Sequence, residues 1–121
     1  MEDELRDFDG GRDLDGSGLK CPVCEASNLH HIGVTFYDRG EDADITTVRE
    51  VLCKTAYQDA YRDEVDIRRE PSDTAKNPSR RRSGMEIHFA CENCQGTAVA
   101  LRINQHKGTT YLDWKFGALK P

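Results

Sequence analysis

The sequence predicts a mainly β fold of one small domain, and three observations support that prediction. Several short segments alternate apolar and polar residues, as half-buried strands do. Four of the five cysteines form two C-x-x-C pairs, at positions 21/24 and 91/94. Only 36% of the 121 residues are apolar, below the roughly 45–50% usual for globular domains. Burial alone therefore gives a thin core, and the sheet needs a second source of stability.

The chain begins with an acidic, glycine-rich segment that has no periodicity. Residues 1–16 hold seven acids and two bases, so the rest of the chain carries fifteen of each and the net charge of −5 comes from this segment. Because the rest of the chain is neutral, the sequence excludes a strongly basic protein that coats DNA without specificity. We predict that residues 1–19 form a disordered tail and that residues 20–121 form a single domain.

The two C-x-x-C pairs are typical of one four-cysteine zinc site. Two thiolates three positions apart can bind one ion from a tight turn, leaving two tetrahedral corners for a second such turn. The alternatives are two disulfides or a redox C-x-x-C, which need an oxidising compartment or a βαβ setting. His30 and His31 are alternative ligands, although four thiolates are preferred. One structural Zn²⁺ is therefore predicted at Cys21, Cys24, Cys91 and Cys94.

Strands are predicted beside both cysteine turns. Residues 29–37 follow the first turn, and residues 85–90 lead into the second. Residues 99–103 and 112–116 form two further strands, separated by a glycine-containing turn at 105–108. An ion that clamps the ends of a small antiparallel sheet defines a zinc ribbon, which is the fold we predict. The residues predicted to face the core are Ile32, Val34, Phe36, Met85, Ile87, Phe89, Val99, Leu101, Ile103, Leu112, Trp114 and Phe116.

A long insertion, residues 40–83 approximately, separates the two halves of this ribbon. Its ends are rich in glycine, proline, serine and charged residues, which predicts loops there. The density of β-branched residues at 45–51 and 65–67 favours an inserted β-hairpin. The spacing of Ile45, Val48, Leu52 and Ala56 also fits a short helix, which is the alternative.

Four segments carry a resemblance to a known group of proteins. They are the C-P-x-C turn, the sequences at 37–41 and 77–81, and the Gln-His-Lys-Gly-Thr-Thr sequence at 105–110 that precedes a tryptophan. Over residues 20–116 the chain resembles small zinc-ribbon proteins encoded by actinobacterial phages and prophages. That family is largely of unknown function. The resemblance implies a zinc ribbon in a phage or prophage setting, acting in the cytoplasm of a bacterial host.

The basic residues predict contact with nucleic acid or with a nucleic-acid-handling complex. Arginine binds phosphate well because its planar donors fork onto two oxygens. The alternative is a solvated loop whose arginines offset the acids at 64, 66, 70 and 73. Trp114 is expected in the core rather than as a platform for stacking bases. The residues predicted to bind are Arg80, Arg81, Arg82, Gln105, His106 and Lys107.

Two other functions compete with this one. A zinc-clamped sheet with a protruding hairpin suits an adaptor or inhibitor that binds a host protein. A remote alternative is a transcript-cleavage factor that uses acidic residues of a hairpin, here Glu41 and Asp42, Glu64 and Asp66, or Glu70 and Asp73. We expect no enzymatic activity, because four thiolates close the coordination sphere that hydrolytic zinc keeps open. The sequence has no apolar run near the roughly 18 residues of a membrane span and no signal peptide at its N-terminus, so we expect a cytoplasmic protein without membrane contact.

Overall fold

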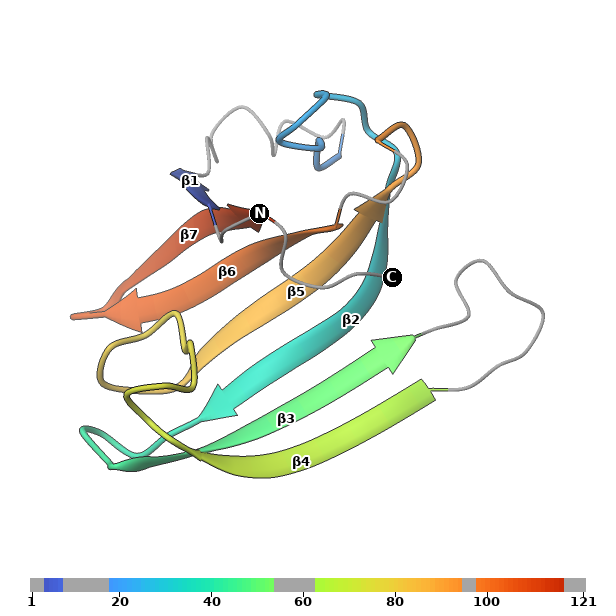
Figure 1. Ribbon diagram of the computed structural model, residues 1–121. Helices are drawn as coiled ribbons and strands as arrows, with labels where there is room; N and C mark the ends of the chain where they lie inside the picture. The colour runs from blue at the N-terminus through green and yellow to red at the C-terminus, as the bar shows by residue number, and fades with distance from the viewer. Residues whose placement is uncertain (1–3, 8–17, 54–62, 95–97, 117–121) are drawn as a thin grey trace.

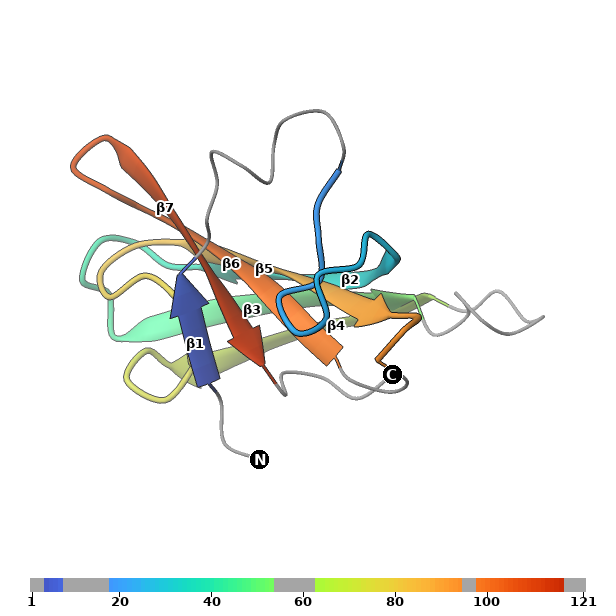
Figure 2. The ribbon, with the colours of Figure 1, turned by 90° about the horizontal axis from the view of Figure 1, so that it is seen from above.

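The computed structural model describes residues 4–7, 18–53, 63–94 and 98–116. In these ranges the regular structure is one open antiparallel sheet of seven strands, in the order β1-β7-β6-β5-β2-β3-β4 (Figure 1). Seen from above, the strands form a single twisted layer (Figure 2). The strands are β1 Glu4–Asp7, β2 Leu29–Asp38, β3 Ile45–Cys53, β4 Asp63–Pro71, β5 Gly84–Cys91, β6 Ala98–His106 and β7 Thr109–Phe116.

The prediction of a mainly β fold is confirmed. The four strands expected beside the cysteine turns correspond to β2, β5, β6 and β7, and the insertion contains the predicted hairpin, β3 and β4. The helical alternative for the start of the insertion is wrong, because Ile45–Cys53 is a strand. β-branched side chains pack well on a pleated surface, and here they outweigh the helical spacing of Ile45, Val48 and Leu52. Ala56, the fourth residue of that spacing, lies outside the described residues.

The inserted hairpin extends the sheet instead of protruding from it as a finger. β3 pairs with β2 from Gly33↔Leu52 to Asp38↔Thr47. Gly33 permits this close approach, since a Cβ there would lie 2.6 Å from the carbonyl oxygen of Val51. The insertion therefore widens one antiparallel layer, and β4 becomes an edge strand.

One face of the sheet, here named the apolar face, holds most of the core. Ile87 pairs with Leu101, and Leu101 pairs with Trp114, so that their side chains share this face. Trp114 is 3% exposed and contacts the edge of the Phe89 ring at a centroid distance of 6.1 Å, which confirms its place in the core. The cluster of buried residues is Val99, Leu101, Trp114 and Phe116, with Leu19, Leu29, Phe89 and Leu112 packed against it.

The expected inward face of β2 is wrong over most of the strand. The register shifts between His31 and Gly33, which marks a β-bulge. Beyond it, Thr35 and Tyr37 are 1% and 5% exposed, whereas Val34 and Phe36, predicted to be inside, are 38% and 37% exposed. The reason is that residues 72–83 fold over the opposite face of the sheet (Figure 1), where Ala75 packs against Tyr37 and Val48.

Residues 4–7 of the predicted tail form a strand in the structure. This segment forms β1, which pairs antiparallel with β7 from Glu4↔Phe116 to Asp7↔Asp113. An edge strand presents unpaired N–H and C=O groups, and the tail backbone can bond to them whatever its side-chain composition. Residues 1–3 and 8–17 of the predicted tail lie outside the described residues.

Candidate functional site

The four predicted zinc ligands come together at one end of β2 and β5. Cys21 and Cys24 lie in the turn before β2, while Cys91 ends β5 and Cys94 lies in the turn that follows. Because Leu29 at the start of β2 pairs with Cys91 at the end of β5, both cysteine turns lie at the same end of these two strands. The four Sγ atoms all lie within 4.8 Å of one another. Among the described residues, this is the one group of three or more Cys, His, Asp or Glu side chains close enough to hold a metal ion.

The sulfur geometry fits a tetrahedral metal ion. Cys21 Sγ lies 3.8 Å from Cys94 Sγ, and Cys24 Sγ lies 3.6 Å from Cys91 Sγ. Four thiolates about 2.3 Å from a central Zn²⁺ are separated by about 3.8 Å, whereas a disulfide needs about 2.05 Å. All four are free cysteines, which excludes the disulfide alternative for them in this structure. These residues can therefore hold a metal ion that supplies a structural cross-link.

Backbone N–H groups donate hydrogen bonds to both sulfurs of the first turn. The backbone N–H of Ala26 lowers the pKa of the Cys24 thiol, which favours the thiolate that binds metal. Val23 N donates to Cys21 Sγ at 3.4 Å, although burial raises the pKa of the Cys21 thiol. Glu25 closes the turn with a φ of 64° and donates its N–H to Cys21 O at 2.8 Å.

The two cysteine turns are also bonded to each other. Glu92 N donates to Asn28 O at 3.1 Å, and Asn28 Nδ2 donates to Asn93 Oδ1 at 3.2 Å. His30, considered as an alternative ligand, instead has Nε2 at 3.2 Å from Glu92 Oε1. These contacts hold the turns in register, so that all four sulfurs face one point.

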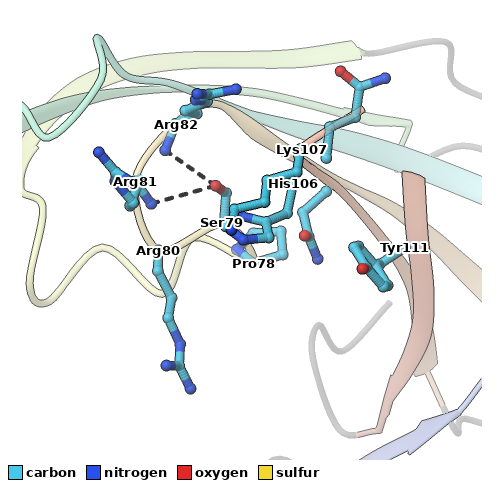
Figure 3. A pocket seen from close by; sticks show the side chains of 10 residues that line it. Pro78, Ser79, Arg80, Arg81, Arg82, His106, Lys107 and Tyr111 are labelled. Carbon is cyan, nitrogen blue, oxygen red and sulfur yellow. Dashed lines mark hydrogen bonds between the residues drawn. The ribbon is translucent and has the colours of Figure 1, made fainter. Parts of the chain in front are cut away.

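The predicted binding residues gather at the other end of the sheet. Gly84 at the start of β5 pairs with Asn104 near the end of β6, so the loop before β5 lies beside the β6–β7 turn. Residues of both segments line one cavity of about 790 Å³, which we name the basic groove (Figure 3). Its lining residues are Pro78, Ser79, Arg80, Arg81, Arg82, Asn104, Gln105, His106, Lys107 and Tyr111.

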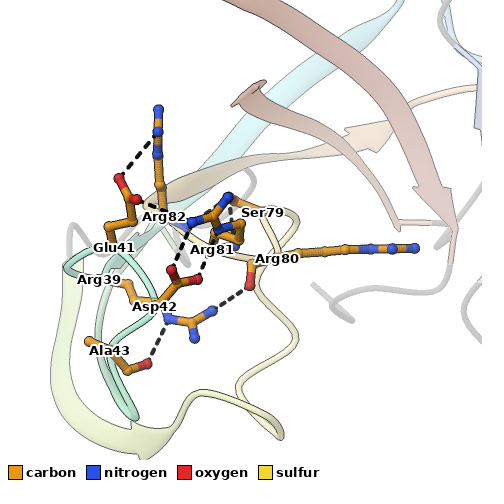
Figure 4. Close-up of polar contacts among 8 residues, drawn as sticks. All are labelled: Arg39, Glu41, Asp42, Ala43, Ser79, Arg80, Arg81 and Arg82. Carbon is orange, nitrogen blue, oxygen red and sulfur yellow. Dashed lines mark hydrogen bonds and ion pairs between the residues drawn. The ribbon is translucent and has the colours of Figure 1, made fainter. Parts of the chain in front are cut away.

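Two of the three consecutive arginines are ion-paired. Arg81 Nε and Nη2 donate to the Asp42 carboxylate at 2.9 and 2.8 Å, and Arg82 Nη2 lies 3.2 Å from Glu41 Oε1 (Figure 4). This pairing lowers the pKa of Asp42 through its hydrogen bonds with Arg81. The acids that compensate the arginines are therefore those of the β2–β3 turn, which makes Glu41 and Asp42 partners of arginine in this structure.

Arg80 is held differently, because its backbone is bonded and its side chain is exposed. Arg39 Nη1 donates to Arg80 O at 2.7 Å, while Ser79 Oγ accepts from Arg82 N at 3.0 Å. The Arg80 guanidinium extends away from the Glu41 and Asp42 carboxylates (Figure 4). The loop backbone is thus fixed by hydrogen bonds and presents one arginine to solvent.

The β6–β7 turn presents the second set of predicted residues. His106 pairs with Thr109, and the two residues between them, Lys107 and Gly108, have φ values of 51° and 81°. Positive φ at both central positions is the pattern of a tight hairpin turn that matches strand twist. Gln105, His106 and Lys107 are all exposed there. The tight turn places their donors at the rim of the groove.

A buried polar cluster on the opposite face of the sheet from Trp114 was missed by the sequence analysis. Glu86 is 2% exposed, and its carboxylate accepts from Tyr37 Oη at 2.9 Å and from Lys115 Nζ at 3.4 Å. Burial raises the pKa of Tyr37 far above its ordinary value, and the negative charge of the nearby Glu86 raises it further. Because Met85, Ile87 and Phe89 are the apolar residues of this strand, their alternation predicts that Glu86 faces solvent. The sequence of one strand does not show that a loop covers its polar face.

The same cluster continues through a histidine. Thr35 Oγ1 donates to Glu50 Oε2 at 2.9 Å and lies 2.8 Å from His88 Nε2. Because the hydroxyl has one proton, Nε2 must be the donor to Thr35, which leaves Nδ1 as the acceptor nitrogen. Within the described residues, Nδ1 is buried without a hydrogen-bond partner. Burial lowers the pKa of His88, which favours the neutral ring.

Comparison with known protein families, curated proteins and solved structures found no match to this chain. In the described residues there is no helix of the length and hydropathy needed to cross a bilayer. The cysteine centre and the basic groove are therefore the two features of the molecule that indicate a function.

Proposed function

We propose that this chain is a zinc-ribbon-type module that binds nucleic acid, alone or within a nucleic-acid-handling complex, through the basic groove. One observation carries the proposal: the loop around Arg80 and the turn at 105–107, which are far apart in the sequence, line one groove. Had they lain at opposite ends of the sheet, each would offer one cation that has no ion pair within the described residues, Arg80 in the loop and Lys107 in the turn. Together they combine positive charge, amide donors and an aromatic ring on one surface.

The metal in this proposal is one structural Zn²⁺. Thiolates are soft ligands, and a four-sulfur tetrahedral set selects zinc or an iron–sulfur centre over harder cations. Two C-x-x-C turns around a single tetrahedral point suit the mononuclear zinc site. When bound, the ion supplies a cross-link between the segment before β2 and the end of β5.

The proposed role is binding, without catalysis. Four protein thiolates fill a tetrahedral zinc coordination sphere, whereas hydrolytic zinc sites have three protein ligands and an open position for water. Of the acids considered for transcript cleavage, Glu41 and Asp42 form ion pairs with Arg81 and Arg82, and Asp66 and Glu70 form ion pairs with Arg68. The resemblance over residues 20–116 further supports a phage or prophage origin, with action in the cytoplasm of the bacterial host.

The experiment compares two single charge reversals that alter net charge equally. Arg80→Glu changes the groove, whereas Arg69→Glu changes an exposed residue of β4 at the other edge of the sheet. Binding of labelled single-stranded and duplex oligonucleotides to the zinc-loaded protein is followed by fluorescence anisotropy over a range of salt concentrations. We expect R80E to weaken binding and to reduce the salt slope by about 1, as for one lost phosphate contact. Equal loss in both variants, or no binding by the unmodified protein, would refute the proposal.

A protein partner is the second candidate, favoured by a separate observation. The apolar face of the β2–β4 region leaves large side chains open to solvent, with Val65 and Ile67 66% and 63% exposed. Contiguous apolar surface of this kind marks interaction sites in soluble proteins. An adaptor or inhibitor of a host protein would use this face, and it would retain its partner after nuclease treatment and in the R80E variant.

A further inference from the structure

We infer that the basic groove selects single-stranded nucleic acid, with Tyr111 as the platform on which an unpaired base stacks. This inference rests on the proposed function and specifies its ligand. Tyr111 is 51% exposed and lines the groove with Arg80 and Lys107 (Figure 3). It pairs across the hairpin with Asn104, which lines the same groove.

The charge of the groove is too small to hold a duplex by its phosphates. Arg81 and Arg82 are compensated by Glu41 and Asp42, whereas Arg80 and Lys107 have no ion pair within the described part of the chain. Proteins that hold duplex DNA through its backbone commonly make about 6–10 phosphate contacts. Two cations without an ion pair, each contacting one phosphate of a single strand, give a slope of log K against log salt concentration of only about −1.4. Most of the affinity must therefore come from another interaction.

Stacking on an aromatic ring supplies that interaction, and it requires an unpaired base. Bases in a duplex are already stacked on both faces, whereas a single strand can place a base against a tyrosine ring. Tyr111 lies on the opposite face of β7 from Leu112 and Trp114, because side chains alternate along a strand. Its ring is therefore not part of the core that contains Trp114, and half of its surface is accessible to a ligand.

An amide side chain beside Tyr111 can contact the edge of the stacked base. Asn104 lines the groove and pairs directly with Tyr111, so both side chains lie on the same face of the hairpin, and the Asn104 amide offers a donor and an acceptor to a base. Arg80 and Lys107 lie in the same groove, where they can bind phosphates on either side of that base. The ligand class is single-stranded DNA or RNA, and the 2′-hydroxyl distinguishes the two.

The test measures anisotropy with three probes of about 12 nucleotides, which is within the span of small single-strand binding sites. The probes are oligo(dT), oligo(U) and a mixed-sequence DNA duplex, and the proteins are unmodified, Tyr111→Ala, Tyr111→Phe and R80E. We expect the single strands to bind at least about tenfold more tightly than the duplex. Y111A should lose about 10- to 100-fold in affinity for the single strands, whereas Y111F should retain it, because phenylalanine keeps the ring.

The outcomes separate the inference from the proposed function. If the duplex binds as tightly as the single strands, or if Y111A binds like the unmodified protein, the inference is overturned while groove binding that R80E weakens still supports the function. If no probe binds the zinc-loaded protein, both fail. Tighter binding of oligo(U) than of oligo(dT), or the reverse, assigns RNA or DNA within the supported class. Urea unfolding of Y111A and Y111F should match that of the unmodified protein, so that a lost affinity reports contact with the ligand.

Discussion

Replacing Glu86 by glutamine tests whether the buried polar cluster holds the centre of the sheet. The carboxylate is buried and accepts hydrogen bonds from Tyr37 and from the ammonium of Lys115, a side chain that is itself 7% exposed. Glutamine preserves the shape and leaves an oxygen for Tyr37, but it removes the negative charge beside Lys115. Breaking one partner of a buried ion pair costs about 3–5 kcal/mol, and the remaining hydrogen bonds place Glu86→Gln at the lower end, about 3 kcal/mol.

The measurement is urea unfolding of the zinc-loaded protein, followed by Trp114 fluorescence and by circular dichroism. Tyr37→Phe removes one charge-assisted hydrogen bond while leaving the ion pair, and we expect it to cost about 1.5–3 kcal/mol. The double variant E86Q/K115M tests coupling: removing both charges should destabilise less than the sum of the single changes. A loss below about 1 kcal/mol for E86Q would refute the reasoning, because an exposed pair contributes only that much.

Three other measurements test the fold and the metal centre. Chelation of the metal, or Cys94→Ser, should abolish cooperative unfolding, because structural zinc contributes about 10–16 kcal/mol to folding; an unchanged melting temperature would contradict a structural metal. Trp114→Ala should cost about 3–5 kcal/mol by circular dichroism in urea, and a value under about 1 kcal/mol would remove Trp114 from the core. The lowered pKa of His88 means that the unfolded chain takes up a proton first as pH falls below about 6.5, so this contribution to stability is present above that pH and is lost below it. His88→Gln should therefore flatten the fall in urea midpoint between about pH 7.5 and about pH 5.5, and an identical fall in both proteins would contradict a buried neutral ring.

The strands and the cysteine centre could be predicted from the sequence because their signals are local. A C-x-x-C pair and a period of two each occupy a few residues, and both carry the same meaning in any context. The juxtaposition of Arg80 with Lys107 could not be predicted, because it depends on which strands are neighbours. Sheet order is a non-local property, and the pairing of Gly84 with Asn104 decides it here.

The faces of β2 show why a period of two is an incomplete guide. Alternation identifies two faces but does not say which one is covered, and the bulge at His31–Gly33 interrupts the alternation within the strand. Tyr37 is buried because Ala75 packs against it, whereas Val34, which shares the apolar face with Ile87, is open to solvent. In a single-layer sheet, what lies over each face is set by loops whose sequences carry no strand periodicity.

The segment that carries the first cysteine turn is also part of the apolar core. Leu19 and Leu29 lie on either side of the first cysteine turn, and both pack against the buried cluster that includes Val99 and Trp114. A sheet of one layer cannot bury its apolar face by itself, so it needs a covering segment fixed in position. A metal ion held by the four cysteines would fix this segment to the end of β5 without additional apolar residues. In this way coordination would compensate for the low apolar content, and the opposite end of β5 and β6 presents the groove.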